Sequence, residues 1–481
     1  MNKIKFILFT ILSILVFMQG FVVPIERLNM TWAFVISIIF VCVYILLYTK
    51  LFFKDLLFLY KYTPAKYLVF FYIWLLFCLV LFVLLGKLSI FKMIYFALRF
   101  FLLTAVFYIL PICIKKFLSL NSIIKIFITI IFVIYAIALF QYFGELFQIP
   151  FTRDIINTFS NFKFSTDGLN DMVDRFTGRM RIRGFFSEPK GLAACICILL
   201  PIIYSYMQNK YVLFKNVFIN KITKITIMPL AWFCIILSKS PIYLIFSIVI
   251  TALYLNKKIL KNIKRIKVMF IPIALFSTVL IMLAFDYEFI LSIIDNSFLS
   301  RISKALIIFK DFDEFVAKEP SLAARIALKF NQTLLFTHFP ITGTGVYCSK
   351  FYMYNQLLQS PVPLTTEIQT SMVLYGGTSI GVAGNAGCLI SSLLVESGII
   401  GTIIYFVFLI TNIKFLKEML KYTTGNIYMF LNGLYYTLCA MIVLSIYYNP
   451  REIAYIYFIY GLVGLFCYEY IKNYKKERMK K

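Results

Sequence analysis

Charged residues are scarce in this sequence, and acidic ones are the scarcest. Of its 481 residues 14% are charged, with 21 Asp and Glu against 48 Lys and Arg, while 62% are apolar. An ordinary soluble domain has roughly 25% charged residues. The composition therefore excludes a soluble globular protein and indicates an integral membrane protein. The net charge of +27 does not indicate nucleic-acid binding, because in a membrane protein the positions of the cations matter more than their sum.

Features that mark several other classes are also missing. The ten cysteines are scattered and nearly all fall inside apolar segments, so no disulfide framework is predicted. The spacing of Asp311 and Asp313 resembles a metal-binding pair, but the neighbouring Lys310 and Glu314 favour a solvated acidic turn. We therefore predict neither a metal nor a cofactor. No fixed-period repeat and no matching pair of broken helices is found, which disfavours an inverted-repeat transporter.

Long apolar segments predict about twelve transmembrane helices. A backbone in lipid must satisfy its own hydrogen bonds, so these segments are expected to be helical and the fold to be all-α and polytopic. The first span lacks an A-x-A cleavage site and is expected to be retained. The predicted spans are 5–22, 32–48, 67–85, 93–114, 123–147, 191–208, 225–237, 241–255, 268–285, 388–411, 427–448 and 453–471.

Lysines fall in alternate links between the spans and predict the orientation of the chain. By the positive-inside rule the lysine-rich links, including the tail with Lys472 to Lys481, are cytoplasmic, and so are both termini. Two long loops lie on the opposite, external face, where chemistry is usual. The chain thus divides into helices 1–5 (1–149), an external loop (150–189), helices 6–9 (190–286), a larger external loop (287–386), and helices 10–12 with a basic tail (387–481).

The first external loop is rich in arginine, on the side where the rule predicts few cations. Guanidinium groups suit bidentate phosphate binding, although long loops also translocate regardless of charge, so a basic solvated loop is the alternative. The loop ends at Glu188, where a span begins. This carboxylate is expected either to neutralise the helix dipole or to take part in catalysis. The arginines are Arg153, Arg175, Arg179, Arg181 and Arg183.

The second external loop contains an amphipathic helical stretch with Arg325, followed by a turn that runs from His338 to Gly345. The glycines and proline of this turn predict backbone N–H groups that face an anion. His338 is the only histidine, and it is interpreted either as structural or as a group for proton transfer near neutral pH.

Two further cations, Arg99 and Lys239, lie apart from these loops. Arg99 interrupts an apolar span, so it is expected to face a cavity or to extend to the membrane surface. Lys239 lies in a short external link. Glu396, in the outer half of a late span, is expected to be paired or solvent-facing.

Four stretches, taken in order, resemble the O-antigen polymerase and O-antigen ligase superfamily of bacterial polysaccharide assembly enzymes. Residues 181–189 are similar to the superfamily's R-x-x-G followed by Glu-Pro, and residues 238–241 to its Ser-Arg link, with Lys239 for the arginine. Residues 325–345 resemble its Arg, helix and His-Pro-x-x-Gly-x-Gly, here with an inserted Phe339. Residues 389–401 are similar to its E-x-G-x-x-G helix.

The resemblance implies a GT-C-like glycosyltransferase that uses undecaprenyl-diphosphate oligosaccharides on the outer face of the bacterial cytoplasmic membrane. The ligase branch carries His-Asn where this chain has Gly387 and Cys388, which favours a polymerase of O-antigen or capsular repeat units. A flippase and a chain-length regulator are the implied partners. In such a reaction charge develops on the diphosphate, so we expect Arg181, Arg183 and Arg325 to bind it, with Lys239 and Arg99 as lesser ligands, and Glu188 or His338 to act as the catalytic base.

Two alternatives remain open at this stage. A ligase would transfer the finished polymer to an acceptor, and a flippase or exporter would move the same lipid-linked sugars. A transporter is expected to place its ionisable residues at mid-membrane, whereas here they gather in external loops and at helix ends, which favours an enzyme.

Overall fold

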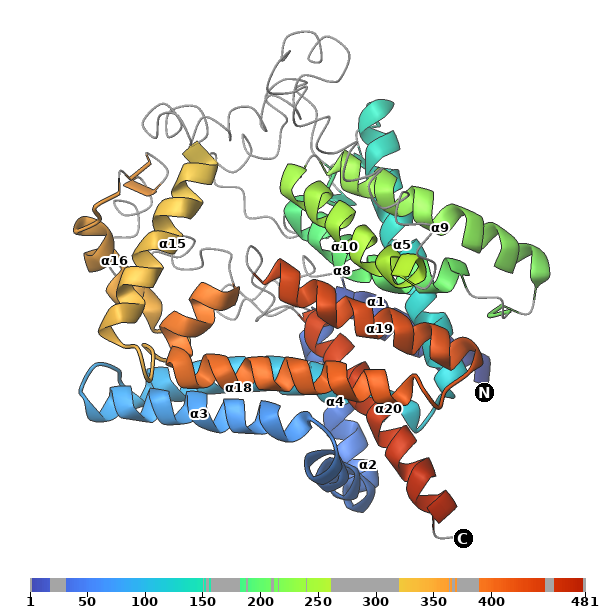
Figure 1. The fold of residues 1–481 in the computed structure, drawn as a ribbon, viewed down its shortest axis with the longest axis horizontal. Coiled ribbons are helices and arrows are strands. Elements are labelled where there is room, and N and C mark those ends of the chain that lie inside the picture. Colours follow the sequence, from blue (N-terminus) through green and yellow to red (C-terminus); the bar gives the residue numbers. More distant parts are fainter. Residues whose placement is uncertain are drawn as a thin grey trace.

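A computed structural model gives the architecture of the chain (Figure 1). It describes residues 2–17, 32–149, 151–152, 155–156, 182–186, 189–208, 212–214, 216–238, 240–260, 320–362, 364–365, 368–369, 389–445 and 454–478, in which α-helix is the regular structure and no strand occurs. The helices are α1 (Asn2–Phe17), α2 (Trp32–Tyr62), α3 (Ala65–Leu84), α4 (Ile90–Lys115), α5 (Leu120–Leu146), α8 (Pro189–Gln208), α9 (Val217–Leu237), α10 (Pro241–Leu260), α15 (Pro320–His338), α16 (Ser349–Leu358), α18 (Leu389–Met419), α19 (Gly425–Leu444) and α20 (Ala454–Arg478).

The prediction of an all-α, multi-pass membrane protein is confirmed. Within the described residues, eight helices are long and apolar enough to cross a bilayer: α2, α3, α4, α5, α8, α9, α18 and α19. Helices α1, α10 and α20 coincide with three more of the predicted spans. The predicted span 268–285 lies outside the described residues.

The helices differ most from the prediction in α2, α9 and α18. Helix α2 continues past the predicted end at Tyr48, where the backbone kinks, to Tyr62. No Gly or Pro interrupts this stretch, so the lysine-bearing link is helical. Helix α9 begins at Val217 rather than at 225. Helix α18, predicted as a continuous span, is broken at Gly398, whose φ of +63° is not helical.

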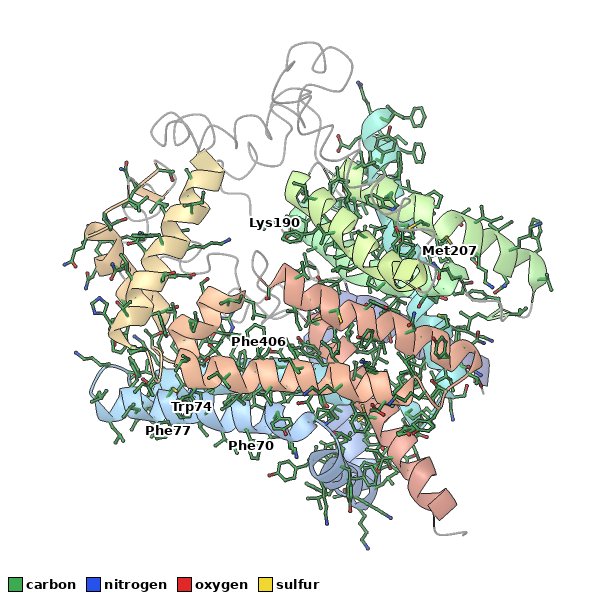
Figure 2. All side chains as sticks on the ribbon, in the orientation of Figure 1. Phe70, Trp74, Phe77, Lys190, Met207 and Phe406 are labelled. Carbon is green, nitrogen blue, oxygen red and sulfur yellow. The ribbon has the colours of Figure 1, made fainter. Side chains whose placement is uncertain are left out.

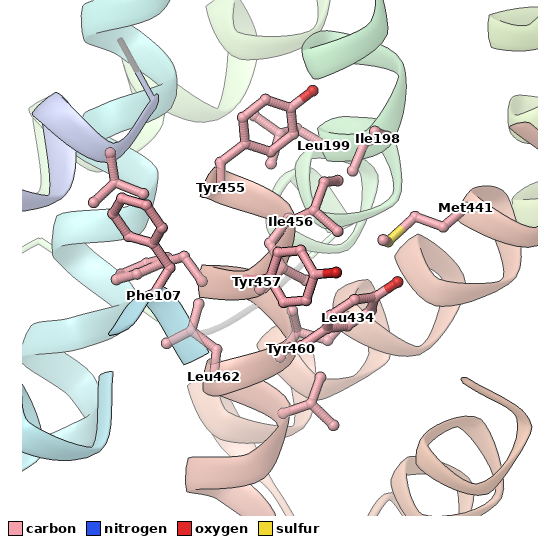
Figure 3. Close-up of a cluster of buried hydrophobic side chains, with 14 of the residues drawn as sticks. Phe107, Ile198, Leu199, Leu434, Met441, Tyr455, Ile456, Tyr457, Tyr460 and Leu462 are labelled. Atoms are coloured by element: carbon pink, nitrogen blue, oxygen red, sulfur yellow. The ribbon is translucent and has the colours of Figure 1, made fainter. Parts of the chain in front are cut away.

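The C-terminal helix α20 lies at the centre of the core. Tyr455, Tyr457 and Tyr460 of α20 pack with side chains of α4, α8 and α19 (Figure 3). Close approach between α20 and α4 depends on Gly461, because an added Cβ there would overlap the main-chain carbonyl of Tyr108. Small residues at helix contacts are the usual means of tight packing in membranes.

Polar contacts between α2, α4 and α20 mark one end of the helix bundle. The Tyr468 hydroxyl donates to Asp55 Oδ1 at 2.6 Å, and Lys115 Nζ lies 3.6 Å from Glu469 Oε1. Lys472 Nζ donates to the Tyr468 hydroxyl at 3.3 Å. The lysine-rich ends of three spans therefore meet at this end, which we call the lysine end.

Candidate functional site

Helices α15 and α16 form a small packing unit on the first half of α18 (Figure 1). The predicted amphipathic stretch belongs to α15, whose apolar face is buried against α16 and α18. The buried side chains are Ala324, Ala327, Leu328, Leu335, Met353, Leu357, Ile368 and Val395. This cluster fixes the C-terminal end of α15, and with it His338, relative to the membrane helices.

Two of the four motif stretches bind each other through their backbones. The Thr344 N–H donates to the carbonyl of Val395 at 2.7 Å, although these residues are 51 positions apart in the chain. The Gly345 N–H donates to the Glu396 carbonyl at 2.9 Å, and the Ile399 N–H donates to the Pro340 carbonyl at 2.9 Å. These bonds satisfy the groups that the break in α18 releases from the helix. We call residues 340–345 and 395–399 the glycine interlock.

Glycine is required on both sides of the interlock. Gly343 has φ +67°, and an added Cβ would lie 2.5 Å from backbone atoms of Glu396, Ser397 and Gly398. Gly398 has φ +63°, and its added Cβ would overlap the Ile341 carbonyl. A side chain here would be strained by its backbone conformation and would also collide with backbone, which cannot move aside easily.

The interpretation of this turn as an anion-binding nest is wrong. The N–H groups of Thr344 and Gly345 donate to carbonyls of α18, and that of Gly343 donates to the Phe339 carbonyl at 2.9 Å. These three N–H groups are hydrogen-bonded within the protein and do not face a ligand. The glycines of the His-Pro-x-x-Gly-x-Gly stretch therefore allow close packing instead of binding phosphate.

Polar side chains surround the interlock. Glu396 is 3% exposed, and Ser349 Oγ donates to its Oε1 at 3.2 Å, so of the two predicted environments this carboxyl group is hydrogen-bonded inside the protein and does not face solvent. Trp74 of α3 donates its Nε1–H to the Ser397 carbonyl at 2.8 Å, while the Thr402 hydroxyl donates to the Gly398 carbonyl at 2.7 Å. Figure 2 shows Trp74 on α3 where α18 runs beside it. The interlock is thus tied to α3 as well.

Arg99 lies at the same end of the bundle. Its guanidinium carbon is 5.1 Å from the ring centroid of Tyr347, two residues after the interlock. Tyr347 has φ +61°, a conformation that is rare for a bulky residue and that recurs at functional sites. The Phe96 and Phe100 rings pack against Tyr347 with centroids 5.6 and 6.3 Å away. Arg99, which is partly exposed, therefore stacks on the Tyr347 ring.

The arginine segment 182–186 packs elsewhere, between α5 and the start of α8. Arg183 is fully buried, and burial lowers the pKa of its guanidinium to about 10, so it stays protonated at neutral pH. The N–H groups of Arg183 and Gly184 both donate to Gln141 Oε1, each at 2.9 Å.

Other predicted site residues fall outside the described part of the chain. Arg181, Glu188 and Lys239 are among them. Arg325 lies on the described helix α15, but its side chain is outside the description. His338 ends α15 and is exposed. The structure therefore brings together His338, Arg99 and the Glu396 stretch at one end of the bundle, whereas it leaves the Arg181, Glu188 and Lys239 predictions untested.

The described residues contain no group of three or more His, Cys, Asp or Glu side chains that could hold a metal ion. The Asp311 and Asp313 pair lies outside them. Around the interlock the described side chains include the Arg99 guanidinium, the Ser349 and Thr402 hydroxyls and the buried Glu396 carboxyl group.

No protein-family model matches this chain. A search of curated proteins also finds no match. The functional proposal therefore rests on the motif resemblance together with the geometry described above.

Three residues, two beside the interlock and one beside the arginine segment 182–186, could not be predicted as site residues from the sequence. Trp74, Gln141 and Tyr347 each sit in or beside apolar runs, where aromatic residues are ordinary. The sequence does contain one indication for Gln141. It is an amide near the end of the apolar segment that forms α5, and a buried amide needs a polar partner.

Proposed function

We propose that this chain is a polysaccharide polymerase, which joins undecaprenyl-diphosphate-linked oligosaccharide repeat units into O-antigen or capsular polysaccharide. The observation that carries the proposal is the glycine interlock. The third and fourth motif stretches, similar to those of the O-antigen superfamily, pack directly on each other, and Arg99 stacks beside them. Motifs that share one structural unit support a common function better than motifs dispersed over a chain.

The reaction that fits these residues is a glycosyl transfer with a diphosphate leaving group. A hydroxyl of one lipid-linked unit attacks the anomeric carbon of the growing chain, the bond from that carbon to the diphosphate oxygen breaks, and the hydroxyl proton passes to a base. His338, exposed at the end of α15, and Glu188 are the proposed bases. Preorganised cations stabilise the charge that develops on the diphosphate without a metal ion. Arg181, Arg183 and Arg325 are the proposed ligands, with Arg99 and Lys239 as lesser ones.

The orientation follows from the two ends of α3 and α4. Leu79 and Phe82, late in α3, contact Gly345 and Phe339, whereas Lys115, which ends α4, belongs to the lysine end. Since α3 has 20 residues, the two ends lie about 30 Å apart, the thickness of a bilayer core. We therefore propose that the lysine end and both termini are cytoplasmic, and that the interlock is external in the bacterial cytoplasmic membrane.

This orientation is tested with single cysteines at two exposed positions, Gln359 after α16 and Tyr422 after α18. We expect Gln359→Cys, but not Tyr422→Cys, to react with a membrane-impermeant thiol reagent applied to intact cells, over the background of the parent protein. Lysed cells serve as the control, because both cysteines should then react. Labelling of only Tyr422→Cys in intact cells would show that the topology is the reverse of the proposed one.

The proposed activity predicts a specific change in a strain that lacks the gene. The surface polysaccharide of this strain is expected to be only one repeat unit long. The wild-type gene on a plasmid should restore the ladder of longer chains. A flippase would instead leave no repeat unit at the surface, and a ligase would leave long chains on the lipid carrier. Either of those patterns would refute the polymerase assignment.

A further inference from the structure

Gln141 is a buried amide near the outer end of α5, a helix whose other buried side chains are mostly aliphatic or aromatic. Its side chain is 1% exposed, and its Oε1 accepts hydrogen bonds from both the Arg183 and Gly184 N–H groups, at 2.9 Å each. An amide oxygen has two lone pairs, so one side chain satisfies two adjacent backbone donors. An aliphatic side chain at this position would leave both donors without that acceptor.

The turn at residues 182–186, which Gln141 binds, has little conformational freedom. Gly184 adopts φ +57°, and an added Cβ would lie 3.5 Å from Ile137 and 3.9 Å from the Ala138 backbone nitrogen. Ile182 and Phe186, on either side, are buried. The backbone of Arg183 is therefore placed directly against α5, and the direction in which its side chain leaves is set there.

The other end of the predicted arginine loop meets α5 one turn further on. Gly144 contacts Thr152 so closely that an added Cβ would overlap the threonine side chain. The chain folds back at this point, where the Ile149 N–H donates to the Gly144 carbonyl at 2.8 Å and the Thr152 N–H to the Ile149 carbonyl at 3.1 Å. Residues 141 and 144 are three apart, so they lie on the same face of the helix.

We propose that Gln141 is a positioning residue of the polymerase reaction, and that Gln141 and Gly144 together form a clasp that holds residues 152 and 183–184 against one face of α5. This inference rests on the proposed function, in which Arg183 stabilises the diphosphate. The clasp holds these residues on one helical turn, and Gln141 fixes the backbone from which the Arg183 side chain extends. Fixing that backbone in advance removes entropy that substrate binding would otherwise have to overcome.

Two substitutions distinguish the effect of the hydrogen-bond acceptor of Gln141 from the effect of the size of its side chain. Gln141→Leu removes the oxygen, whereas Gln141→Glu keeps two oxygen acceptors in nearly the same place. Phe140→Leu is the matched control, because Phe140 is the adjacent residue, is 39% exposed, and has no part in the clasp. All three are compared at equal abundance in the membrane.

The first readout is independent of activity: the rate at which trypsin cleaves after Arg183, measured by mass spectrometry of the fragments. Arg183 is buried in the clasped state, so cleavage requires local opening. Loss of two hydrogen bonds is expected to speed this cleavage by about 10- to 100-fold in Gln141→Leu. Gln141→Glu and Phe140→Leu are expected to retain the wild-type rate.

The second readout is steady-state polymerisation. Misplacement of a group that acts in the transition state lowers kcat while KM for the lipid-linked unit changes little, so we expect about a 10- to 100-fold loss of kcat in Gln141→Leu, with recovery in Gln141→Glu.

The outcomes distinguish the two proposals. Unchanged cleavage after Arg183 in Gln141→Leu overturns the clasp, whatever the activity. Faster cleavage with an unchanged kcat overturns the positioning role. Faster cleavage in a protein whose wild type makes no polymer supports the clasp and refutes the polymerase function.

Discussion

Replacement of Gly398 by alanine is expected to abolish polymer formation and to lower the free energy of unfolding by on the order of 3 kcal/mol. Two effects add. A non-glycine residue in the left-handed conformation costs about 1–2 kcal/mol, and overpacking against a fixed backbone typically costs about 1–3 kcal/mol. The added methyl would meet the Ile341 carbonyl, separate the two halves of the interlock, and displace His338 from the membrane helices. The measurement is the thermal unfolding midpoint of the purified variant in detergent, alongside its polymer ladder.

Gly425→Ala provides a matched control for backbone strain alone. Gly425 has φ +67°, close to the +63° of Gly398, but nothing lies within 4 Å of its added Cβ. The Gly425→Ala variant should lose only as much stability as the left-handed conformation costs an alanine, and it should keep its activity. If both variants lose the same stability, the collision of the added methyl with the interlock backbone has no effect beyond the strain of the left-handed conformation.

Among the substitutions of charged residues, replacement of Arg183 is expected to have the largest effect on catalysis. By analogy with single donors to a developing oxyanion, Arg183→Ala should lower kcat by about 100-fold or more. Water screens a buried guanidinium less, so its attraction to a diphosphate is stronger than at the surface. Arg183→Lys keeps the charge but offers a point contact in place of a planar fork, so most of the activity should still be lost.

The Arg183→Lys variant also has a pH signature. Burial favours the neutral form of a cation, and it lowers the pKa of Arg183 to about 10. An ammonium starts from a lower pKa than a guanidinium, so the charge of the lysine is lost at a lower pH. Residual activity of Arg183→Lys should therefore fall, relative to wild type, as the pH rises from 7 toward 9, a range below the pKa of Arg183 in which the wild type keeps most of its cation.

Lys190→Ala is the charge control for this comparison, because Lys190 is an exposed cation in the first turn of α8 (Figure 2). It is expected to leave kcat within about twofold of wild type, as is usual for a cation outside the reacting site. If Arg183→Lys restores a normal ladder at wild-type abundance, bidentate recognition at Arg183 is wrong.

Helix positions could be predicted because lipid imposes one requirement on every span. Apolar runs of sufficient length must be helical in a bilayer, so α3, α4 and α5 coincide with predicted segments to within a few residues. The continuation of α2 beyond Tyr48 was missed because its lysines mark the membrane surface, and a helix does not have to end there.

The break in α18 could not be predicted in the same way. Gly398 lies inside a predicted span, and the break is stable only because residues 340–345 supply hydrogen-bond partners from a distant part of the chain. The motif resemblance identified both segments but carried no information about their contact. For the same reason the burial of Arg183 was missed, since it depends on Gln141, which is 42 positions away.

The central claim is most directly tested by the purified protein in liposomes, supplied with undecaprenyl-diphosphate-linked repeat units in the presence of a metal chelator. We predict chains of several repeat units that remain attached to undecaprenyl diphosphate, with one free undecaprenyl diphosphate released for each linkage formed. Arginine side chains stabilise the leaving group, so the chelator should not reduce the rate. Movement of intact units across the bilayer without release of the diphosphate would contradict the polymerase assignment. Complete loss of activity that a divalent ion restores would contradict its metal-independent mechanism.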